Sequence, residues 1–221
     1  MEKKYLLGID IGTTNTKMVI IDNSGGLVCS ASRPSTLLAP VNGWAEENPN
    51  EWWDNIKLLV PECLKLANIL PSKISGVGVS GMVPTVILLD ESGAVIRNSI
   101  QQNDARVINE IKKFQDRTDA SEILRKTGSA ITQQSVGPKI DWLMTHEPEN
   151  IKKTSHIMGS YDYINLRLTG NLYVEHNWAL ESGLYNLTTK NWDSDLMTLY
   201  CISPSWLSPV KEPSEIMGYI N

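Results

Sequence analysis

Residues 8–17, GIDIGTTNTK, combine the alternation of a strand with side chains that could bind a metal ion and phosphates. An isolated carboxylate such as Asp10 is costly to place in a sheet, but a magnesium ion and its waters would compensate the charge. The glycine of the following turn would let the backbone approach a polyphosphate, whose oxygens would bind backbone N–H groups and hydroxyls. The stretch therefore predicts Asp10 as a metal ligand. The predicted phosphate-binding residues are Gly12, Thr13, Thr14, Asn15 and Lys17.

The same stretch also fits a plain hairpin, in which Asp10 accepts hydrogen bonds from backbone N–H groups of its own turn. A Walker phosphate loop is excluded, because no G-x-x-x-x-G-K-[ST] stretch occurs in the 221 residues. On these residues alone, both interpretations of Asp10 stay open.

The composition is that of a globular protein with little electrostatic attraction for nucleic acid or lipid. The chain has 41% hydrophobic and 20% charged residues, a net charge of −5 and a pI near 5.3. It contains no run of lysines or arginines, so we expect neither nucleic acid nor a membrane as a partner. Its length fits one large domain, or one domain with an insertion.

The cysteines and the N-terminus indicate a cytoplasmic protein. Cys29, Cys63 and Cys201 are scattered and form no zinc-binding spacing with the three histidines, which favours reduced thiols. The first residues contain too few apolar side chains for a signal-peptide core or a membrane span.

Three strand patterns precede the first predicted helix. Residues 5–11 alternate, and residues 17–22 and 27–33 are strand candidates separated by the turn sequence NSGG. These patterns predict an antiparallel three-stranded meander. A similar turn, DESG, joins residues 86–89 to residues 94–96 and predicts a second hairpin.

A helix is predicted to begin after Asn48, a capping residue, with Pro49 at its first position and Glu51 completing a capping box. Pro61 lies inside the helical pattern. Because an interior proline lacks an N–H donor and clashes with the carbonyl four residues earlier, we expect a kink or two helices there. The glycine-spaced apolar run at residues 74–81 predicts a strand of a covered sheet.

The second half of the chain is predicted to be mainly helical, with helices at residues 104–115, 121–126, 137–145 and 162–168. The order of three strands, a helix, a strand and further helices predicts a mixed α/β domain.

Several segments resemble those of a known family. Residues 8–17 resemble the first phosphate motif of the superfamily of sugar kinases, heat-shock chaperones and actin. The other segments occur in the order and rough spacing of the FGGY carbohydrate kinases: GWAEENPNEWW (43–53), VSGMVPTVILLD (79–90), QQNDAR (101–106), PKIDWLMTHEP (138–148) and DYINLRLTG (162–170). The resemblance covers nearly the whole chain and is closest to the xylulose kinase branch.

The resemblance implies a ribonuclease-H-like α/β domain with a mixed five-stranded sheet and flanking helices. It also implies a kinase that uses ATP and Mg²⁺ to phosphorylate a sugar hydroxyl, with a ketopentose such as xylulose as the expected substrate. A homodimer of the full-length protein is a further expectation. Two alternatives stay open: a catalytically inactive module that binds a sugar or a partner, and an ATPase of the same superfamily that uses no sugar.

The family's substrate loop aligns with Met82, Val83 and Pro84. Related kinases present a methionine–histidine or arginine–glutamate pair to sugar hydroxyls in this loop. Val83 and Pro84 cannot make those hydrogen bonds, and apolar walls discriminate weakly between hydroxyl patterns. The loop therefore does not predict which sugar is bound.

Two further segments are expected near the substrate by resemblance. Asn103 and Asp104 match a Trp-Asn-Asp-Gly-Arg type of stretch, and together with Arg106 they would lie near a polyol. Alternatively, Asn103 and Asp104 cap the helix that follows them. Gln134 stands where some relatives have a substrate tyrosine.

The remaining expectations concern the end of the chain. Glu175 and Asn177 occupy the place of a Thr-Asp-x-Ser segment that closes the domain in relatives, and we interpret them as structural. The family's general base is an aspartate in a Gly-Asp-Asn or Gly-Asp-Gln motif, which this sequence lacks. We therefore expect no catalytic residue in the chain, and a base beyond Asn221. Residues 1–221 would be the N-terminal, sugar-binding domain without the nucleotide-binding domain, and would be inactive alone.

Overall fold

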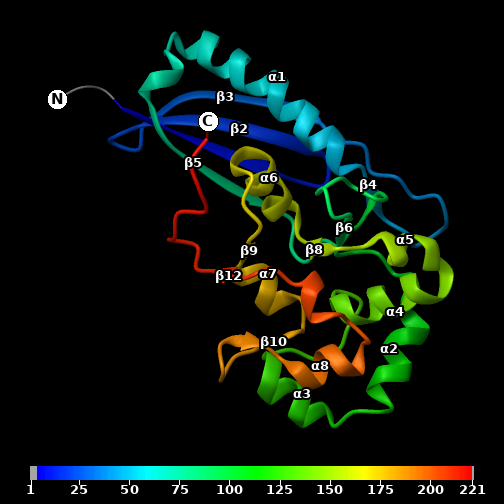
Figure 1. Cartoon of the computed structure of the whole chain (residues 1–221). Coiled ribbons are helices and arrows are strands. Elements are labelled where there is room, and N and C mark those ends of the chain that lie inside the picture. The colour runs from blue at the N-terminus through cyan, green and yellow to red at the C-terminus, as the bar shows by residue number, and fades with distance from the viewer. Residues whose placement is uncertain (1–3, 221) are drawn as a thin grey trace.

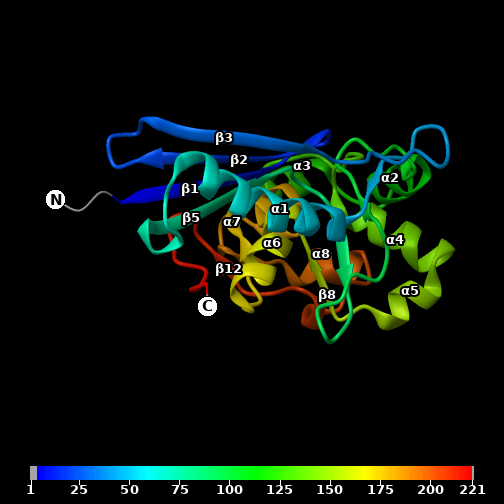
Figure 2. The same cartoon turned by 90° about the horizontal axis from the view of Figure 1, so that it is seen from above.

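A four-stranded sheet forms one layer of the molecule, and helices lie against one of its faces (Figures 1 and 2). In the computed structural model, which describes residues 4–220, the strand order is β3 (Leu27–Pro34), β2 (Asn15–Asp22), β1 (Tyr5–Ile11) and β5 (Ile74–Gly81). β2 runs antiparallel to both β1 and β3, while β1 and β5 are parallel. The mixed α/β class and the predicted meander are confirmed.

The main sheet has four strands rather than the five that the resemblance implies. Within residues 4–220, no strand pairs with the edge of β5 that faces away from β1. The next apolar run, β6 (Ile87–Leu89), pairs instead with β8 (His156–Met158) in a separate two-stranded sheet. The hairpin expected at β6 is short: besides a tight turn it has the bridge between Leu89 and Val95 and the hydrogen bond from the Ile96 N–H to the Leu88 carbonyl, at 3.0 Å.

The two faces of the main sheet differ as strand alternation requires. Leu7, Ile9 and Ile11 of β1 are at most 4% exposed and belong to the hydrophobic core. α1 (Pro49–Ala67) contributes Trp52 to the same core and lies on that side of the sheet (Figure 2). Asp10 has the opposite orientation and stays partly exposed.

The start of α1 confirms one sequence prediction and corrects two. The side chain of Asn48 caps the helix by accepting a hydrogen bond from the N–H two residues later, at 3.0 Å. Glu51 does not complete a capping box, because its carboxylate accepts hydrogen bonds from the backbone N–H and hydroxyl of Thr36. Pro61 lies inside one continuous helix, so the alternative of two helices is wrong, while the kink stays a prediction.

The second half of the chain adds a mainly helical layer, as predicted. Its helices are α2 (Ile108–Gln115), α3 (Ala120–Thr127), α4 (Val136–His146), α5 (Pro148–Lys153), α6 (Ser160–Thr169), α7 (His176–Glu181) and α8 (Ser194–Leu199). Short strands outside the main sheet are β4 (Glu46–Glu47), β7 (Ser99–Ile100), β9 (Val174–Glu175), β10 (Tyr185–Asn186), β11 (Asn191–Trp192) and β12 (Val210–Lys211), and 3₁₀ turns occupy Pro71–Lys73 and Pro204–Trp206.

The structure corrects the predicted start of the helix after residue 104, and it does not describe the last residue of the chain. α2 begins at Ile108, with Val107 at its cap position, so Asn103 and Asp104 are not its capping residues. Asn221, beyond which the catalytic base is expected, lies outside the described residues. Among the helices within residues 4–220, none has the length and apolar character needed to span a bilayer.

Candidate active site

The turn between β1 and β2 holds the predicted metal and phosphate residues, and we call residues 10–17 the Asp10 hairpin. The turn is closed by a hydrogen bond from the Gly12 N–H to the Asn15 carbonyl, at 3.0 Å. The hydroxyl of Ser80, on the neighbouring strand β5, donates to Oδ1 of Asp10 at 2.9 Å. Among the described residues, Asp10 accepts no backbone N–H of its own turn, so the capping interpretation has no hydrogen bond to support it.

The other predicted residues of the hairpin are partly or fully exposed. Thr13 and Asn15 are partly exposed, and the Thr14 hydroxyl accepts a hydrogen bond from the Asn15 amide at 3.0 Å. Lys17 is exposed and is the cross-strand partner of Asp10. One partly exposed carboxylate beside the Ser80 hydroxyl fits Mg²⁺, which commonly binds one or two carboxylates and completes its shell with phosphate and water.

The predicted substrate loop adjoins the Asp10 hairpin. The N–H of Met82 donates to the carbonyl of Ile11 at 3.1 Å, so the loop leaves β5 beside the end of β1. Close packing enforces this path, because a Cβ added to Gly81 would lie 2.6 Å from the Ser160 hydroxyl. Met82 and Pro84 are buried, and only Val83 of the three predicted residues is partly exposed.

Residues 101–104 reach the same end of the sheet through a chain of hydrogen bonds. The hydroxyl of Thr85 donates to the Met82 carbonyl at 3.2 Å and lies 3.3 Å from Oε1 of Gln101. Gln101 is buried, whereas Asn103 is exposed at the tip of the turn. Lys139, from α4, donates to the Gln101 carbonyl at 3.0 Å. These bonds tie the turn that carries Asn103 to the segment at Met82, and contact of Asn103 with a sugar stays a prediction.

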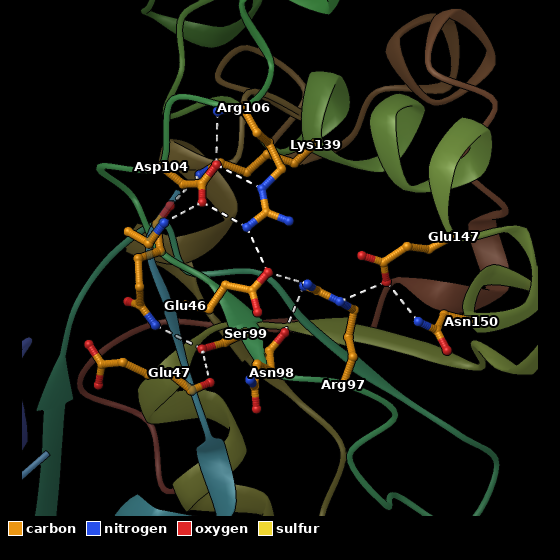
Figure 3. Close-up of polar contacts among 12 residues, drawn as sticks. Glu46, Glu47, Arg97, Asn98, Ser99, Asp104, Arg106, Lys139, Glu147 and Asn150 are labelled. Carbon is orange, nitrogen blue, oxygen red and sulfur yellow. Dashed lines mark hydrogen bonds and ion pairs between the residues drawn. The ribbon is translucent and has the colours of Figure 1, made fainter. Parts of the chain in front are cut away.

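Asp104 occupies a different environment from Asn103. Its carboxylate is completely buried, accepts the Ala45 N–H at 2.6 Å and pairs with Arg106 at 2.8 Å (Figure 3). Burial by itself raises the pKa of Asp104, but these bonds to Arg106 and Ala45 outweigh it, so the pKa is held below its usual range. The assigned partners of this carboxylate are therefore protein groups, and its contact with a substrate stays a prediction.

Asp104 belongs to a set of paired charges that we call the buried ion network. Its members are Glu46, Arg97, Asp104, Arg106 and Glu147. The guanidinium carbon of Arg106 packs against two tryptophan rings that touch each other, 3.9 Å from the centroid of Trp44 and 4.9 Å from that of Trp142. The network ties the turn at 101–106 to the segment around β4, as Figure 3 shows. The Asp104–Arg106 pair is local, but the pairs that Glu46 and Glu147 form with the two arginines join residues about 50 or more positions apart, and no local spacing in the chain indicates them.

Lys139 lies beside this network, and among residues 4–220 no carboxylate pairs with its ammonium group at hydrogen-bond distance. Its side chain is fully buried, and burial lowers its pKa to about 7, with Arg106 acting in the same direction and Asp104 opposing. Sequence reasoning identified Lys139 only as part of a family segment. Gln134, one turn earlier in the chain, is exposed just before α4 and makes a local backbone bond to Thr132.

Comparison with known proteins identifies the family. The profile "FGGY family of carbohydrate kinases, N-terminal domain" matches residues 5–221. Xylulose kinase of Bacillus subtilis is 30% identical over 97% of this chain, and glycerol kinase of Brevibacillus brevis is 27% identical over 99%. The chain spans 43% and 45% of the length of these two relatives.

Solved structures of carbohydrate kinases support the same family assignment. Xylulose kinase from Rhodospirillum rubrum superposes with a TM-score of 0.94 at 39% identity, covering 100% of this chain and 45% of that one. Gluconate kinase from Lactobacillus acidophilus gives a TM-score of 0.92 at 28% identity, with coverage of 100% and 44%. The chain belongs to the FGGY family of carbohydrate kinases and has the fold of the family's N-terminal domain.

Proposed function

We propose that this chain is the sugar-binding half of an ATP-dependent kinase that phosphorylates a hydroxyl of a ketopentose such as xylulose. The observation that carries the proposal is the hydrogen bond between Ile11 and Met82, which joins the Asp10 hairpin to the substrate loop. Phosphoryl transfer depends on holding a polyphosphate and an acceptor hydroxyl side by side, and this junction would do so.

The residues of this half would position the reactants. Asp10, held by Ser80, would bind the Mg²⁺ that neutralises phosphate charge. The turn at Thr13 and Thr14 would hold phosphate oxygens, and Asn103 would lie near the sugar. The proton of the acceptor hydroxyl would be removed by a base outside this chain, so the isolated half would bind without turning over.

A xylulose preference is supported by the similarity to xylulose kinases, which are among the relatives with the higher identities. A glycerol kinase and a gluconate kinase are also similar to this chain, so glycerol and gluconate are the main alternative acceptors. A non-sugar ATPase is disfavoured, because the family match extends over residues 5–221.

The test is a coupled assay of ADP release with the full-length gene product and with this chain alone. We expect kcat/KM for D-xylulose to exceed that for glycerol or gluconate by at least roughly tenfold. We expect only background release from the 221-residue chain. A preference for glycerol or gluconate would overturn the substrate assignment, and turnover by the chain at the full-length rate would overturn the division of labour.

A further inference from the structure

The substrate loop lines a cavity whose polar groups come from elsewhere in the fold. Val83 lines a cavity of about 1030 Å³ that runs along β5. Val83 has no side-chain hydrogen-bonding group, and Pro84 is buried. A polyol in this position would need hydrogen-bond partners from another wall, since unpaired hydroxyls lose their bonds to water. The cavity wall across α6 and α7 carries Tyr161, Glu175 and Asn177.

This wall is fixed directly to the substrate loop. The hydroxyl of Ser160, the first residue of α6, donates to the Met82 carbonyl at 2.8 Å. The indole N–H of Trp178, in α7, donates to the Thr85 carbonyl at 2.8 Å. Tyr161 and Asn177 follow or precede these two anchors directly in the sequence, and both line the same cavity as Val83.

The two short helices are packed too closely for the wall to shift easily. A Cβ added to Gly159 would lie only 2.3 Å from Cδ1 of Trp178. The N–H of Glu175 donates to the buried carboxylate of Asp162 at 2.8 Å, which joins β9 to α6. Figure 1 shows β9 descending beside α6 and leading into α7.

Within the wall, Asn177 is oriented by Glu175. The Glu175 carboxylate accepts both the backbone N–H and the side-chain Nδ2 of Asn177, each at 3.0 Å. Glu175 is only 9% exposed, whereas Asn177 is exposed. Among the described residues, Oδ1 and the second amide hydrogen of Asn177 have no assigned partner and could bind a ligand. The Tyr161 side chain, 6% exposed, lies beside the Glu175 carboxylate, and burial keeps the pKa of its hydroxyl well above the ordinary value, so the hydroxyl stays protonated.

We propose that Asn177, held in place by Glu175, supplies the hydrogen bonds to a sugar hydroxyl that Val83 and Pro84 cannot supply. The inference rests on the proposed function and deepens it, because it makes Asn177 a specificity-determining residue. It also revises the interpretation of Glu175 and Asn177 as purely structural. The ligand class is a linear polyol or ketose with a hydroxyl that can both donate to and accept from a carboxamide.

The test is a titration of the 221-residue chain with D-xylulose. NMR signals of the Val83 methyl groups and of the Asn177 side-chain amide are recorded at each sugar concentration. We expect both sets of signals to shift with one dissociation constant. We expect Asn177→Ala to weaken binding roughly three- to tenfold, since a neutral hydrogen bond is worth about that factor. Asn23→Ala, in the exposed turn between β2 and β3, is the matched control and should leave affinity unchanged.

A set of pentitols, each lacking one hydroxyl, identifies the partner group. One deletion should weaken binding to the wild type but not to Asn177→Ala, because the variant has already lost that bond. Unchanged affinity in Asn177→Ala, or Val83 shifts without Asn177 shifts, would overturn the inference and leave the proposed function standing. The absence of any sugar-induced shift would instead refute sugar binding by this half. If the alanine variant fails to fold, the shift of the Asn177 amide signal in the wild type decides whether Asn177 contacts the sugar.

Discussion

The Asp10 hairpin and the buried ion network lie at the same end of the molecule but satisfy their polar groups in opposite ways. The hairpin is partly exposed, and its carboxylate accepts one side-chain hydrogen bond, from Ser80. In the network, the side chains of Arg106 and Asp104 are fully buried and bonded to each other, and Arg106 also bonds Glu46. The partly exposed carboxylate of Asp10 keeps hydrogen-bonding capacity that a ligand could use. The buried charged groups of the network instead satisfy one another within the protein.

The largest effect is expected where the network is broken. Arg106→Met would leave the Glu46 and Asp104 carboxylates buried without their shared cation. We expect the free energy of unfolding to fall by about 3–5 kcal/mol, measured by urea denaturation. Lys112→Met removes an exposed pair with Asp116 and should cost at most about 0.5 kcal/mol. Equal effects of the two variants would contradict the claim that the buried ion pairs stabilise the fold more than an exposed one does.

Glu47, which lies beside the buried ion network, should make the free energy of unfolding depend on pH. Burial, with a smaller contribution from Glu51, raises its pKa from 4.5 to about 7 despite the hydrogen bond from Trp52, and Oε1 of its carboxylate has no partner among the described residues. Because the folded state favours the neutral acid, its contribution is fully present below pH 4.5 and is lost as pH rises through about 7.

Glu47→Gln tests this contribution. The variant should match the wild type near pH 4.5 and exceed it by up to about 3 kcal/mol at pH 8, measured by denaturant unfolding across that range. A wild-type profile that Glu47→Gln leaves unchanged would show that another group is responsible.

Asp10→Asn should separate function from stability. In the full-length enzyme we expect kcat/KM to fall roughly 100-fold, because a neutral amide cannot hold Mg²⁺ and phosphate charge as a carboxylate does. The melting temperature should change little, since Asp10 is partly exposed and has one assigned side-chain partner. Near-normal activity would refute the metal-binding role.

The smallest effect is expected from Ser80→Ala, which removes the hydrogen bond that orients Asp10. We expect kcat/KM to fall roughly fivefold, corresponding to about 1 kcal/mol for one hydrogen bond. Ser32→Ala, at an exposed position on β3, is the control. A Ser80→Ala loss as large as that of Asp10→Asn would indicate that Ser80 itself meets the ligand.

The sequence by itself determined the strands, turns and helix starts that depend only on neighbouring residues. Period-two alternation and turn residues predicted the meander of β1, β2 and β3, and Asn48 predicted the start of α1. The family segments predicted the α/β class and the family itself. Such features follow from local backbone preferences and from short motifs, which need no knowledge of the remaining chain.

Tertiary structure alone decided which distant groups each polar side chain meets. Glu51 bonds Thr36 instead of its own helix, and Asp104 is buried against Ala45 and Arg106 instead of facing outward. β6 pairs with β8 across more than sixty residues, which no local pattern encodes. A carboxylate or a strand edge can be satisfied by many partners at similar free energy, so packing of the whole chain selects the partner.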